Sequence, residues 1–513
     1  MHMRDFLYSS AQIRAIESLH AKMKPKESLM LRAGAAVAVL ASKIAKKKRG
    51  ANILLLAGPG NNGGDAWVAA AALKKAGQRV TVLAPREQKN AAPVAKSAHA
   101  AYRKAKGIVV TKFPSDDKFD LIVDGLFGIG LQRAPEGIFA EVITHANANA
   151  DRNHTPILAI DVPSGLSADT GVAFGATIQA DFTLTFLGAK PGLYTADGVD
   201  HAGEIHVESL GVAAASSKGE LLCRAAIATL IPKRRNNSHK GSFGNVAIIG
   251  GAAGMIGAAV LAARAALHMG PGKVFLGLAA KEAPGYDPIN PEIMMRTAEE
   301  LVSDESMTAF AIGMGLSTDK TAPRLLTTAL AHALPTVIDA DALTLISSNP
   351  SIYQALQAKI AAKPHQFLSL IFTPHPGEAA RLLGLSTDEI QSDRINAAKS
   401  IAAKFNAVTV LKGAGTVIAT PDGRYWINTT GNPGMASGGM GDALSGMIAA
   451  FLAQGMNAPD AAKLGVYLHG AAADECLAHG MAPHGLTASE VIFEARTLLN
   501  AGLAAHDHDN DHH

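Results

Sequence analysis

The sequence is poor in cysteine, which argues against a metal site built from cysteine ligands. Its 513 residues include two cysteines, Cys223 and Cys476, which lie far apart and form no metal-binding spacing. Sparse cysteine use fits a reducing cytoplasm best, because disulfides are rare there. We therefore expect a cytoplasmic protein without a cysteine-based metal motif.

An excess of charge is also lacking. The chain carries 47 basic and 44 acidic side chains, a net charge of +3. This balance gives no electrostatic reason to expect nucleic acid as the main partner. The short basic run at residues 46–49 is better explained as favourable charge at a helix C-terminus.

No long hydrophobic run is present either. A membrane-spanning helix needs about 20 apolar residues, and the nearest candidate, residues 257–269, is shorter and contains Arg264. The opening residues, MHMRDFLYSS, lack the apolar core of a signal peptide. We therefore expect no membrane partner.

The chain does contain two blocks in which short apolar runs alternate with alanine-rich helical patterns. This alternation predicts an α/β fold with a parallel sheet covered by helices on both faces. We expect a Rossmann-like, doubly wound domain over 1–215, a polar linker at 212–222 and a larger α/β domain over 225–503. The tail, 504–513, is polar and expected to be disordered, with no framework for a specific metal site.

Individual elements follow from the same patterns. In the first block, strands are expected at 52–57, 79–83, 108–110, 120–124, 157–161, 182–186 and 204–208, and helices at 10–20, 27–46, 65–76 and 90–105. In the second, strands are expected at 245–250, 273–277, 309–312, 335–339, 368–372, 408–411, 415–419 and 424–428, and helices at 441–454, 459–478 and 487–502.

The first candidate site begins at GPGNNGGDAW, residues 58–67, directly after an apolar strand. Its glycines permit close backbone approach, and ligands of doubly wound sheets lie beyond the carboxyl ends of strands. A helix starting near Asp65 would add amides that attract phosphate. The stretch matches neither the dinucleotide motif nor the P-loop, so it is a weak signal by itself.

Two further strand ends are acidic. Asp124 is followed by a glycine-rich loop ending at Arg133, and Asp161 is followed by a tight Pro-Ser-Gly turn containing Ser164. One aspartate at a strand end is more often a turn former than a catalyst. Three consecutive polar strand ends would converge on one cleft, so together they favour a functional site.

These motifs resemble those of the NAD(P)HX epimerases: NNGGD, DxxFGxG with a following arginine, DxPSG, and TLTFLGAKPGLY at 183–194. The resemblance covers about 1–215 and implies an isomerase that interconverts the R and S forms of hydrated NADH or NADPH, NAD(P)HX. It implies K⁺ held by Asn62, Asp124 and Ser164, and Asp161 as the residue that contacts substrate and is our acid–base candidate. The other substrate-binding residues that it implies are Asn61, Asn62, Gly63, Gly64, Asp65, Gly128, Ile129, Gly130, Leu131, Gln132, Arg133 and Ala134.

The substrate of such an enzyme carries a hydroxyl at C6 beside a ring nitrogen. Epimerisation needs either reversible loss of that hydroxyl or ring opening at the same carbon, and both routes stay open. One poised carboxylate would shuttle the proton. The alternative, a non-catalytic binding or assembly module, is disfavoured because the motif residues are intact.

The second candidate site is ASGGMGDALSG, residues 436–446, before an apolar helix. Its glycines bring backbone amides to a helix N-terminus, which makes an anion hole for phosphate. Asp442 is either an ordinary N-terminal carboxylate or a base for a hydroxyl being phosphorylated. The Gly-x-Gly-Asp pattern is typical of the ribokinase-like superfamily and by itself indicates only a small-molecule kinase.

Other segments resemble the ADP-dependent NAD(P)HX dehydratases over about 225–500: NSHKGSFGNVAIIGG, VIDADAL, TPHPGEAARLLG, LKGAGTVIA and TGNPGMASGGMGDALSG. The resemblance implies a ribokinase-like fold and a lyase that phosphorylates the substrate hydroxyl with ADP, giving AMP, before phosphate leaves. Asp442 would be the base. The nucleotide would be held by Lys412, Gly413, Ala414, Gly415, Thr416 and Gly441, and the hydrated cofactor by Ala258, Gly315, His375 and Asp442.

Some positions keep two interpretations. His375 would ordinarily be a structural loop histidine, although the motif favours a ligand role, and Lys240 is either a phosphate contact or a solvated lysine. Mg²⁺ is expected with the nucleotide phosphates, and residues 290–292 are one position for it. Three stretches depart from the families. They are Arg133-Ala134-Pro135, where Arg-Pro is usual, Met30-Leu31-Arg32-Ala33-Gly34, where Met-Glu-Arg-Ala-Gly is usual, and Gly313-Met314-Gly315, where Gly-Pro-Gly is usual.

Together the two halves predict a bifunctional repair enzyme, in which the epimerase supplies the epimer that the dehydratase consumes. A vitamin or sugar kinase that stops at the phosphate ester is the alternative for the second half, and the specific segments argue against it. Alanine-rich helix faces suggest self-association, and relatives favour tetramers or higher, so we expect a homo-oligomer.

Overall fold

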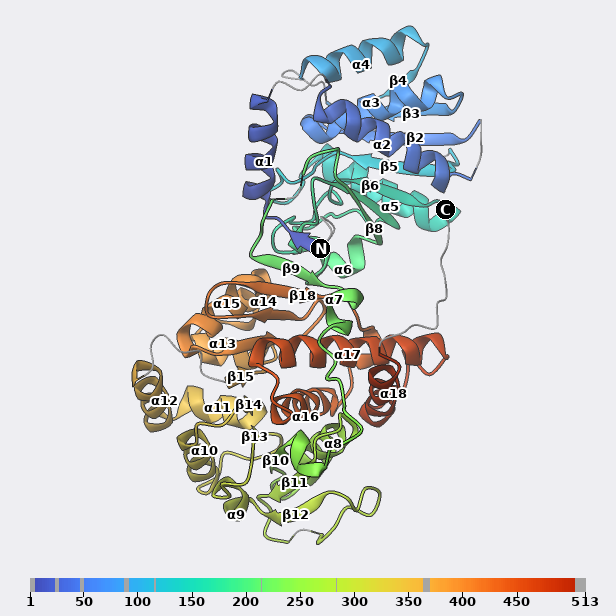
Figure 1. Cartoon of the computed structure of the whole chain (residues 1–513). Coiled ribbons are helices and arrows are strands. Elements are labelled where there is room, and N and C mark those ends of the chain that lie inside the picture. Colours follow the sequence, from blue (N-terminus) through green and yellow to red (C-terminus); the bar gives the residue numbers. More distant parts are fainter. Residues whose placement is uncertain are drawn as a thin grey trace. The chain divides into compact units, whose positions relative to one another are not determined.

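The computed structural model describes residues 5–23, 27–46, 50–86, 92–114, 117–213, 215–282, 284–362 and 370–502. The chain forms two compact units, residues 1–220 and 221–513 (Figure 1). The basic run at 47–49 and the polar tail at 504–513 lie outside the described residues. Among the described helices, none has both the length and the apolarity of a membrane span.

The first unit is built around a parallel sheet. The strands of the sheet are β2 (Asn52–Ala57), β3 (Arg79–Leu83), β4 (Ile108–Val110), β5 (Leu121–Gly125), β6 (Ile157–Ile160), β7 (Phe182–Phe186) and β8 (Glu204–Glu208), and the short strand β1 (Phe6–Leu7) lies outside it. Its helices are α1 (Ser10–Lys22), α2 (Leu29–Ile44), α3 (Asn61–Lys75), α4 (Pro93–Lys104), α5 (Ile138–Asn153) and α6 (Gly198–His201). The parallel strand order is β4-β3-β2-β5-β6-β7-β8. The order reverses between β2 and β5, which is the Rossmann-like switch point where ligands bind.

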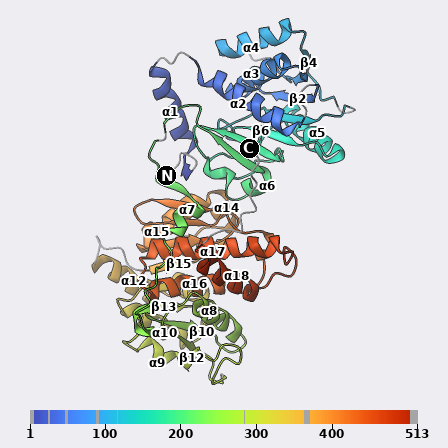
Figure 2. The same cartoon turned by 45° about the vertical axis from the view of Figure 1, so that its right-hand side comes forward.

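Different helices cover the two faces of this sheet. Along β2, Ile53 and Leu55 pack with α2 and α3, whereas Leu54 and Leu56 pack with α5. Figures 1 and 2 show α2 and α3 on one side of the sheet and α5 on the other. The alternation follows from the two-residue period of a strand. Each fully buried leucine or isoleucine contributes roughly 1.5–3 kcal/mol, so both faces stabilise the unit.

The second unit holds a larger doubly wound sheet. Its strands are β10 (Asn245–Gly250), β11 (Lys273–Leu278), β12 (Met294–Thr297), β13 (Ala309–Ile312), β14 (Thr336–Ile338), β15 (Leu370–Phe372), β16 (Val408–Leu411), β17 (Val417–Ala419) and β18 (Tyr425–Asn428). Its helices are α7 (Arg224–Ala228), α8 (Ile256–His268), α9 (Ala298–Val302), α10 (Ala322–Ala331), α11 (Ala340–Ser348), α12 (Pro350–Ala362), α13 (Pro376–Leu383), α14 (Thr387–Ser392), α15 (Arg394–Phe405), α16 (Met440–Ala453), α17 (Ala458–Ala478) and α18 (Ala488–Asn500). The parallel order β12-β11-β10-β13-β14-β15-β16 is extended by antiparallel β17 and β18. The predicted α/β class is therefore confirmed for both halves.

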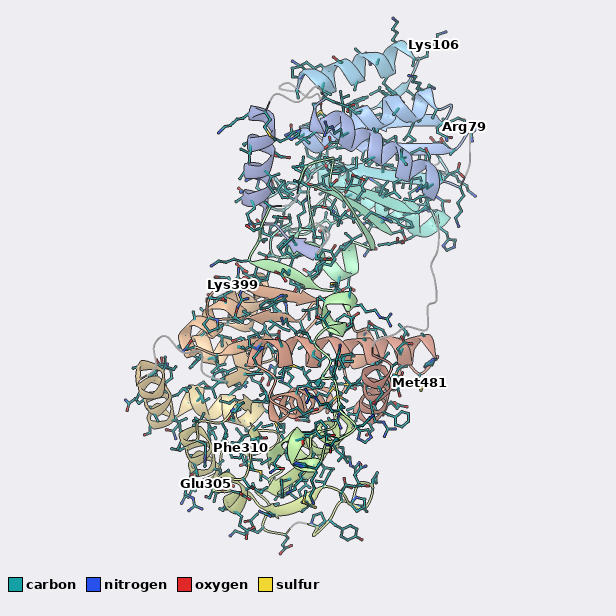
Figure 3. The ribbon with its side chains drawn as sticks, viewed as in Figure 1. Arg79, Lys106, Glu305, Phe310, Lys399 and Met481 are labelled. Carbon is teal, nitrogen blue, oxygen red and sulfur yellow. The ribbon has the colours of Figure 1, made fainter. Side chains whose placement is uncertain are left out.

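Helices also pack on both faces of the second sheet. Ala309 and Ala311 of β13 share one core with α8, α16, α17 and α18. Phe310, labelled in Figure 3, is fully buried in the same strand, and its ring packs edge-on against His332, which follows α10. Successive side chains of β13 therefore pack on opposite faces of the sheet.

One helix boundary differs from the prediction in a way that matters for the site. Helix α3 begins at Asn61, with Gly60 as its N-cap, and not near Asp65. The NNGGD motif therefore forms the first helical turn rather than a loop. Glycine fits this helix at position 64 because a neighbouring helix packs closely against it. A Cβ at Gly64 would lie 2.6 Å from the Met30 side chain.

The expected linker at 212–222 is wrong in part, because it contains a strand, β9 (Gly219–Leu222). Phe6 and Leu7 of β1 pair antiparallel with the first two residues of β9. The strands β1, β9 and β12 were not predicted. β12 is short and largely exposed, so it lacks the apolar signal that identified the buried strands.

Candidate active sites

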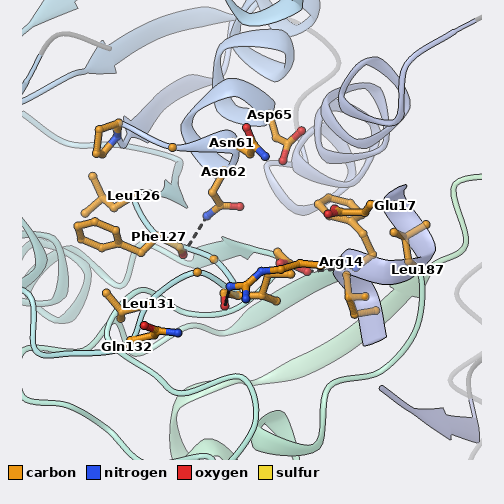
Figure 4. Close-up of a pocket in the computed structure, with 18 of the residues that line it drawn as sticks. Arg14, Glu17, Asn61, Asn62, Asp65, Leu126, Phe127, Leu131, Gln132 and Leu187 are labelled. Atoms are coloured by element: carbon orange, nitrogen blue, oxygen red, sulfur yellow. Dashed lines mark hydrogen bonds between the residues drawn. The ribbon is translucent and has the colours of Figure 1, made fainter. Parts of the chain in front are cut away.

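A cavity of about 830 Å³ opens in the first unit, next to the carboxyl ends of β2, β5 and β6 (Figure 4). Its volume lies in the range of cofactor-sized sites, roughly 300–1,000 Å³. The lining includes these predicted residues: Asn61, Asn62, Asp65, Gly128, Ile129, Gly130, Leu131, Gln132, Arg133 and Asp161. The polar strand ends therefore converge at the switch point of the sheet, as expected.

Three residues that were predicted to contact substrate do not line this cavity. Gly63 and Gly64 are buried inside α3, where Gly64 faces Met30 of α2. Ala134 is half-buried, with its Cβ near Gly175. For Gly64, close helix packing gives a structural reason for the glycine that is separate from ligand contact.

Asp161 is held at the end of β6 in a left-handed backbone conformation, with φ of 67°. Its Oδ1 accepts a hydrogen bond from Lys190 Nζ at 2.6 Å. The fully buried Lys190 also donates to Thr185 Oγ1 at 2.8 Å and to the Phe186 carbonyl at 2.6 Å. Positive φ in a non-glycine residue is strain that persists where the surroundings enforce it, often at functional sites.

Gly128 places a loop against both Asp161 and Asn62. A Cβ at Gly128 would lie 3.2 Å from Asp161 Oδ2 and 3.3 Å from Asn62 Oδ1. The second carboxylate oxygen and the amide oxygen thus face the same loop, while Lys190 occupies the first carboxylate oxygen. One oxygen of Asp161, Oδ1, is therefore hydrogen-bonded to Lys190, and the other, Oδ2, faces the cavity side.

Asp124 and Ser164 form a fully buried pair beside this loop. Asp124 Oδ1 accepts from Ser164 Oγ at 2.7 Å, and Oδ2 accepts from the Ser164 amide at 2.8 Å. The Phe127 amide donates to Ser164 Oγ, and Asn62 Nδ2 donates to the Phe127 carbonyl, both at 2.9 Å. Burial raises the pKa of Asp124 to about 6, partly offset by hydrogen bonds from Ser164 and Leu126. The three predicted K⁺ ligands therefore lie together around Phe127.

Helix α1 adds two charged cavity residues that sequence reasoning missed, Arg14 and Glu17. Arg14 Nη2 donates to the Ile129 carbonyl at 3.3 Å. Burial, followed by the Asp161 charge, raises the pKa of Glu17, although Lys190 and Arg14 oppose this. Burial, Asp161 and Glu17 raise the pKa of Asp65 well above its usual range. In Figure 4, Glu17 and Asp65 reach the cavity from α1 and α3.

The second candidate site surrounds the start of α16. Gly439 is the N-cap, in a left-handed conformation with φ of 91°, and Asp442 lies in the first turn. Asp442 is half-buried. Burial and the nearby Asp339 raise the pKa of Asp442 to about 6, while Lys412 acts in the opposite direction.

Lys412, directly after β16, connects the charged groups of this site. Its Nζ lies 2.8 Å from Asp339 Oδ1 and 3.9 Å from Glu378 Oε2. Buried Asp339 also accepts from Ser445 Oγ at 2.8 Å. A Cβ at Gly441 would lie 3.2 Å from Lys412 Nζ. Two predicted nucleotide residues, Lys412 and Gly441, therefore adjoin at a helix N-terminus, an arrangement suited to phosphate.

The loop after Lys412 depends on glycine. Gly413 and Gly415 have φ of 137° and 62°. A Cβ at Gly413 would lie 2.9 Å from both terminal nitrogens of Arg394. Arg394 is buried and donates to the Leu411 and Lys412 carbonyls. The guanidinium therefore fixes the backbone that leads into the predicted nucleotide residues.

His375 is the N-cap of α13. Its Nδ1 accepts from the Gly377 amide at 3.0 Å, and its own amide donates to Glu378 Oε2 at 2.7 Å. Its Nε2 lies 3.4 Å from Glu378 Oε1, and the ring is about half exposed. The structural interpretation thus has a physical basis, and the ligand role stays a prediction.

The other residues singled out in the second unit are a neighbouring pair, Ala258 and Gly315, and two exposed side chains, Lys240 and Glu292. Ala258 and Gly315 adjoin, because a Cβ at Gly315 would lie 3.3 Å from the Ala258 Cβ. Gly315 has φ of 59°, and the preceding family departure, Met314, is fully buried. Lys240 and Glu292 are exposed. Their predicted contacts with phosphate or Mg²⁺ stay predictions.

Two family models match the chain, in the same order as the two sites. "YjeF-related protein N-terminus" matches residues 26–192, and "NAD(P)H-hydrate dehydratase" matches residues 246–494. The chain is 38% identical to the bifunctional NAD(P)H-hydrate repair enzyme of Escherichia coli (strain K12), covering 94% of this chain and 91% of that one. The chain belongs to the bifunctional NAD(P)H-hydrate repair enzymes. The family member of Coxiella burnetii is 36% identical, over 96% of this chain and 99% of that one.

Among solved structures, the repair-enzyme chain is similar to an ADP/ATP-dependent NAD(P)H-hydrate dehydratase from Bacillus subtilis co-crystallized with ATP/Mg²⁺. The two are 30% identical, with 55% of this chain and 98% of that chain covered and a TM-score of 0.47. Family membership confirms the resemblance that the motifs of both halves carry.

Sequence reasoning did not single out Lys190, Asp339 or Glu378 in this family member. All three lie within quoted motifs, TLTFLGAKPGLY, VIDADAL and TPHPGEAARLLG, so a signal was present without a role attached to it. Arg14 and Glu17 lie in an amphipathic helix with no motif, and only the cavity identifies them.

Proposed function

We propose that this chain repairs hydrated NADH and NADPH in two steps. The first unit epimerises R- and S-NAD(P)HX, and the second dehydrates the S form to NAD(P)H, converting ADP to AMP and phosphate. The observation that carries the proposal is the near full-length match to bifunctional repair enzymes, in a chain that holds one carboxylate-bearing site in each unit.

In the first unit, the cavity would take the nicotinamide end of the hydrated cofactor. Asp161 is the proposed acid–base residue because one of its oxygens faces the Gly128 loop at the cavity. The glycine-rich N-terminus of α3 and the exposed Arg133 would bind the anionic phosphates of the substrate. Asn61 and the residues 128–132 would form the remaining walls.

The residues around Phe127 fit a K⁺ ion. Asn62 donates its amide nitrogen to the Phe127 carbonyl, so its own oxygen is directed elsewhere. Carboxylate, amide and hydroxyl oxygens from Asp124, Asn62 and Ser164 are the hard donors that such a cation prefers. When bound, K⁺ would neutralise the buried Asp124 carboxylate. The loop that contacts substrate is fixed by the hydrogen bonds at Phe127.

In the second unit, Asp442 is the proposed base for the C6 hydroxyl of the substrate. The hydroxyl oxygen attacks the β-phosphorus of ADP as Asp442 takes the proton, and AMP leaves. Loss of phosphate from C6 and of a proton from C5 then restores the dihydropyridine ring. The Lys412 ammonium and the α16 amides would offset the phosphate charge. Ala414 and Thr416 complete the proposed nucleotide loop, with Ala258, Gly315 and His375 on the cofactor side.

Mg²⁺ would enter with the nucleotide, since such ions bind through phosphates plus one or two carboxylates. Among the described residues, no group of three or more histidines, cysteines or acids could hold a metal ion alone. This fits an ion carried mainly by phosphate. Self-association to a tetramer or higher and a cytoplasmic location stay predictions from the sequence.

A coupled assay tests the proposal. Purified full-length protein receives mixed R- and S-NADHX with ADP, Mg²⁺ and K⁺, and NADH absorbance is followed. We expect both epimers to be converted completely. Conversion of only the S form contradicts the epimerase, and absence of NADH with phosphorylation of another alcohol contradicts the dehydratase.

A further inference from the structure

The cavity of the first unit holds three carboxylates from three different elements. Glu17 comes from α1, Asp65 from α3, and Asp161 from the end of β6. Their surroundings differ, although they share one cavity. Pairs of carboxylates in unequal environments commonly divide acid and base roles between them.

Asp161 is held by a close ion pair with Lys190. Its Oδ1 is 2.6 Å from the Lys190 ammonium, and all three Lys190 protons have partners. Breaking a buried ion pair leaves an uncompensated charge, so Lys190 stays bonded to Oδ1 of Asp161. An ionised carboxylate accepts a proton but has none to give to a departing hydroxyl. The leaving step therefore needs a second group that carries a proton.

Asp65 is placed to be that group. Within the described part of the chain, no cation pairs with its carboxylate, and its two charged neighbours, Asp161 and Glu17, are both acidic. Like charges and burial favour the neutral form, and the pKa of Asp65 is raised well above its usual range. Glu17 is less suited, because Lys190 and Arg14 both favour its charged form.

We propose that epimerisation uses two carboxylates, with Asp65 as the general acid and Asp161, held by Lys190, as the general base. This inference rests on the proposed epimerase function of the first unit. It replaces the single shuttling carboxylate that the sequence suggested, and it selects loss of the hydroxyl over ring opening.

The step balances without an oxidant. Asp65 protonates the C6 hydroxyl, the C6–O bond breaks and water leaves, while the ring nitrogen lone pair forms the N1=C6 bond. A water then adds to C6 from the opposite face and returns that pair to N1. Asp161 takes the proton of the added water. One proton leaves Asp65 and one reaches Asp161, and proton exchange with solvent returns both carboxylates to their starting forms before the next turnover.

The other charged groups at the cavity leave this division intact. Arg14 and Arg133 line it with the three carboxylates, and Arg14 donates to the Ile129 carbonyl. Helices α2 and α4 also pack against α3, but none of their described charged side chains lines the cavity. Lys190 does not line it either and acts through Asp161, so it is a positioning residue.

The main test compares Asp65→Asn and Asp65→Glu with the exposed control Asp151→Asn on α5. Full-length enzyme with K⁺ is assayed for epimerisation and, separately, for dehydration of S-NADHX with ADP. We expect Asp65→Asn to slow epimerisation about 100-fold or more, the usual contribution of general acid catalysis. Dehydration and the control should be unchanged, and Asp65→Glu should restore part of the rate.

The pH profile separates chemistry from structure. A general acid works only while protonated, so wild-type epimerisation should fall as pH rises through the acid's pKa, and Asp65→Asn should lose that limb. If Asp65→Asn misfolds, the Asp65→Glu profile decides, since its alkaline limb must move. A rate within about threefold of wild type, an unmoved limb, or loss of the limb in Glu17→Gln instead would overturn the assignment.

Two further measurements test the loss of the C6 hydroxyl and the positioning role of Lys190. Epimerisation in H₂¹⁸O should place ¹⁸O at C6 of the new epimer, and retention of ¹⁶O overturns the hydroxyl-loss step. Lys190→Met should lower kcat of epimerisation more than it changes KM, because Asp161 then loses the ammonium that holds its Oδ1, and Lys190→Arg should restore part of kcat. A change confined to KM overturns its positioning role. If the wild-type enzyme does not epimerise at all, the proposed function fails, and not this assignment of roles.

Discussion

The two sites use a lysine and a carboxylate in different arrangements. In the first unit, Lys190 pairs directly with the proposed reacting carboxylate, Asp161. In the second, Lys412 pairs with Asp339, a neighbour of the proposed base, and Asp442 is left with a pKa raised to about 6. The first arrangement is a direct ion pair with the reacting carboxylate, whereas the second leaves a base with a pKa of about 6. Similar glycine-rich helix starts thus support different proton chemistry.

The largest expected effect comes from Asp442→Ala. Loss of the base should slow ADP-dependent dehydration about 10³-fold or more, because no other described carboxylate occupies the first turn of α16. Epimerisation should stay at the wild-type rate. Both half-reactions are measured on the same preparation, and near-normal dehydration would show that Asp442 is not the base.

Asp161→Ala should have the converse effect. Epimerisation should fall about 10²- to 10³-fold, while S-NADHX is still dehydrated normally. The change also leaves the buried Lys190 unpaired, so the melting temperature of the first unit should drop, and Asp161→Asn serves as the closer isostere. Epimerisation that survives in both variants would contradict the first half of the comparison.

The pH dependence of dehydration should be a smaller effect. Asp442 acts in its deprotonated form and has a pKa of about 6, so kcat/KM is expected to hold above pH 7 and fall as pH drops through 6. At pH 5 it should be about tenfold below the plateau. The measurement is initial rate against pH with saturating ADP; a flat profile between pH 5 and 8 would separate Asp442 from the proton transfer.

Gly128→Ala should have the smallest effect. The new methyl group would lie 3.2 Å from Asp161 Oδ2 and 3.3 Å from Asn62 Oδ1, and mild overpacking costs about 1 kcal/mol or more. We expect about a fivefold loss of epimerisation kcat/KM and unchanged dehydration. Gly285→Ala, where a Cβ also meets nothing within 4 Å, is the control, because Gly285 is not among the residues of either proposed site.

The fold class was predictable because buried strands and amphipathic helices carry local patterns. Strands such as β2, β3 and β10 match their predicted limits, since every buried position in them is apolar. The short, exposed β12 has no such pattern and was missed. The start of α3 was misplaced because Gly63 and Gly64 are typical of a loop in the local sequence, whereas close packing against Met30 favours Gly64 within the helix.

The site was predictable where a motif names a residue, and not where a residue acts through a distant contact. Asp161 stands out at a strand end, but its partner Lys190 lies 29 positions later, and only the fold brings the two to 2.6 Å. Glu17 is a polar residue on an amphipathic helix, which is ordinarily a solvated position. Its place at the cavity depends on how α1 packs, which no local pattern encodes.

The most direct test of the two-step repair starts from pure R-NADHX with the wild-type chain and its Asp442→Ala variant, each with ADP. We expect the wild-type chain to convert R-NADHX completely to NADH. We expect the variant to form the S epimer to equilibrium and to produce no NADH. Unchanged R-NADHX in both samples, beside normal dehydration of added S-NADHX by the wild-type chain, would contradict the claim that one chain performs both steps.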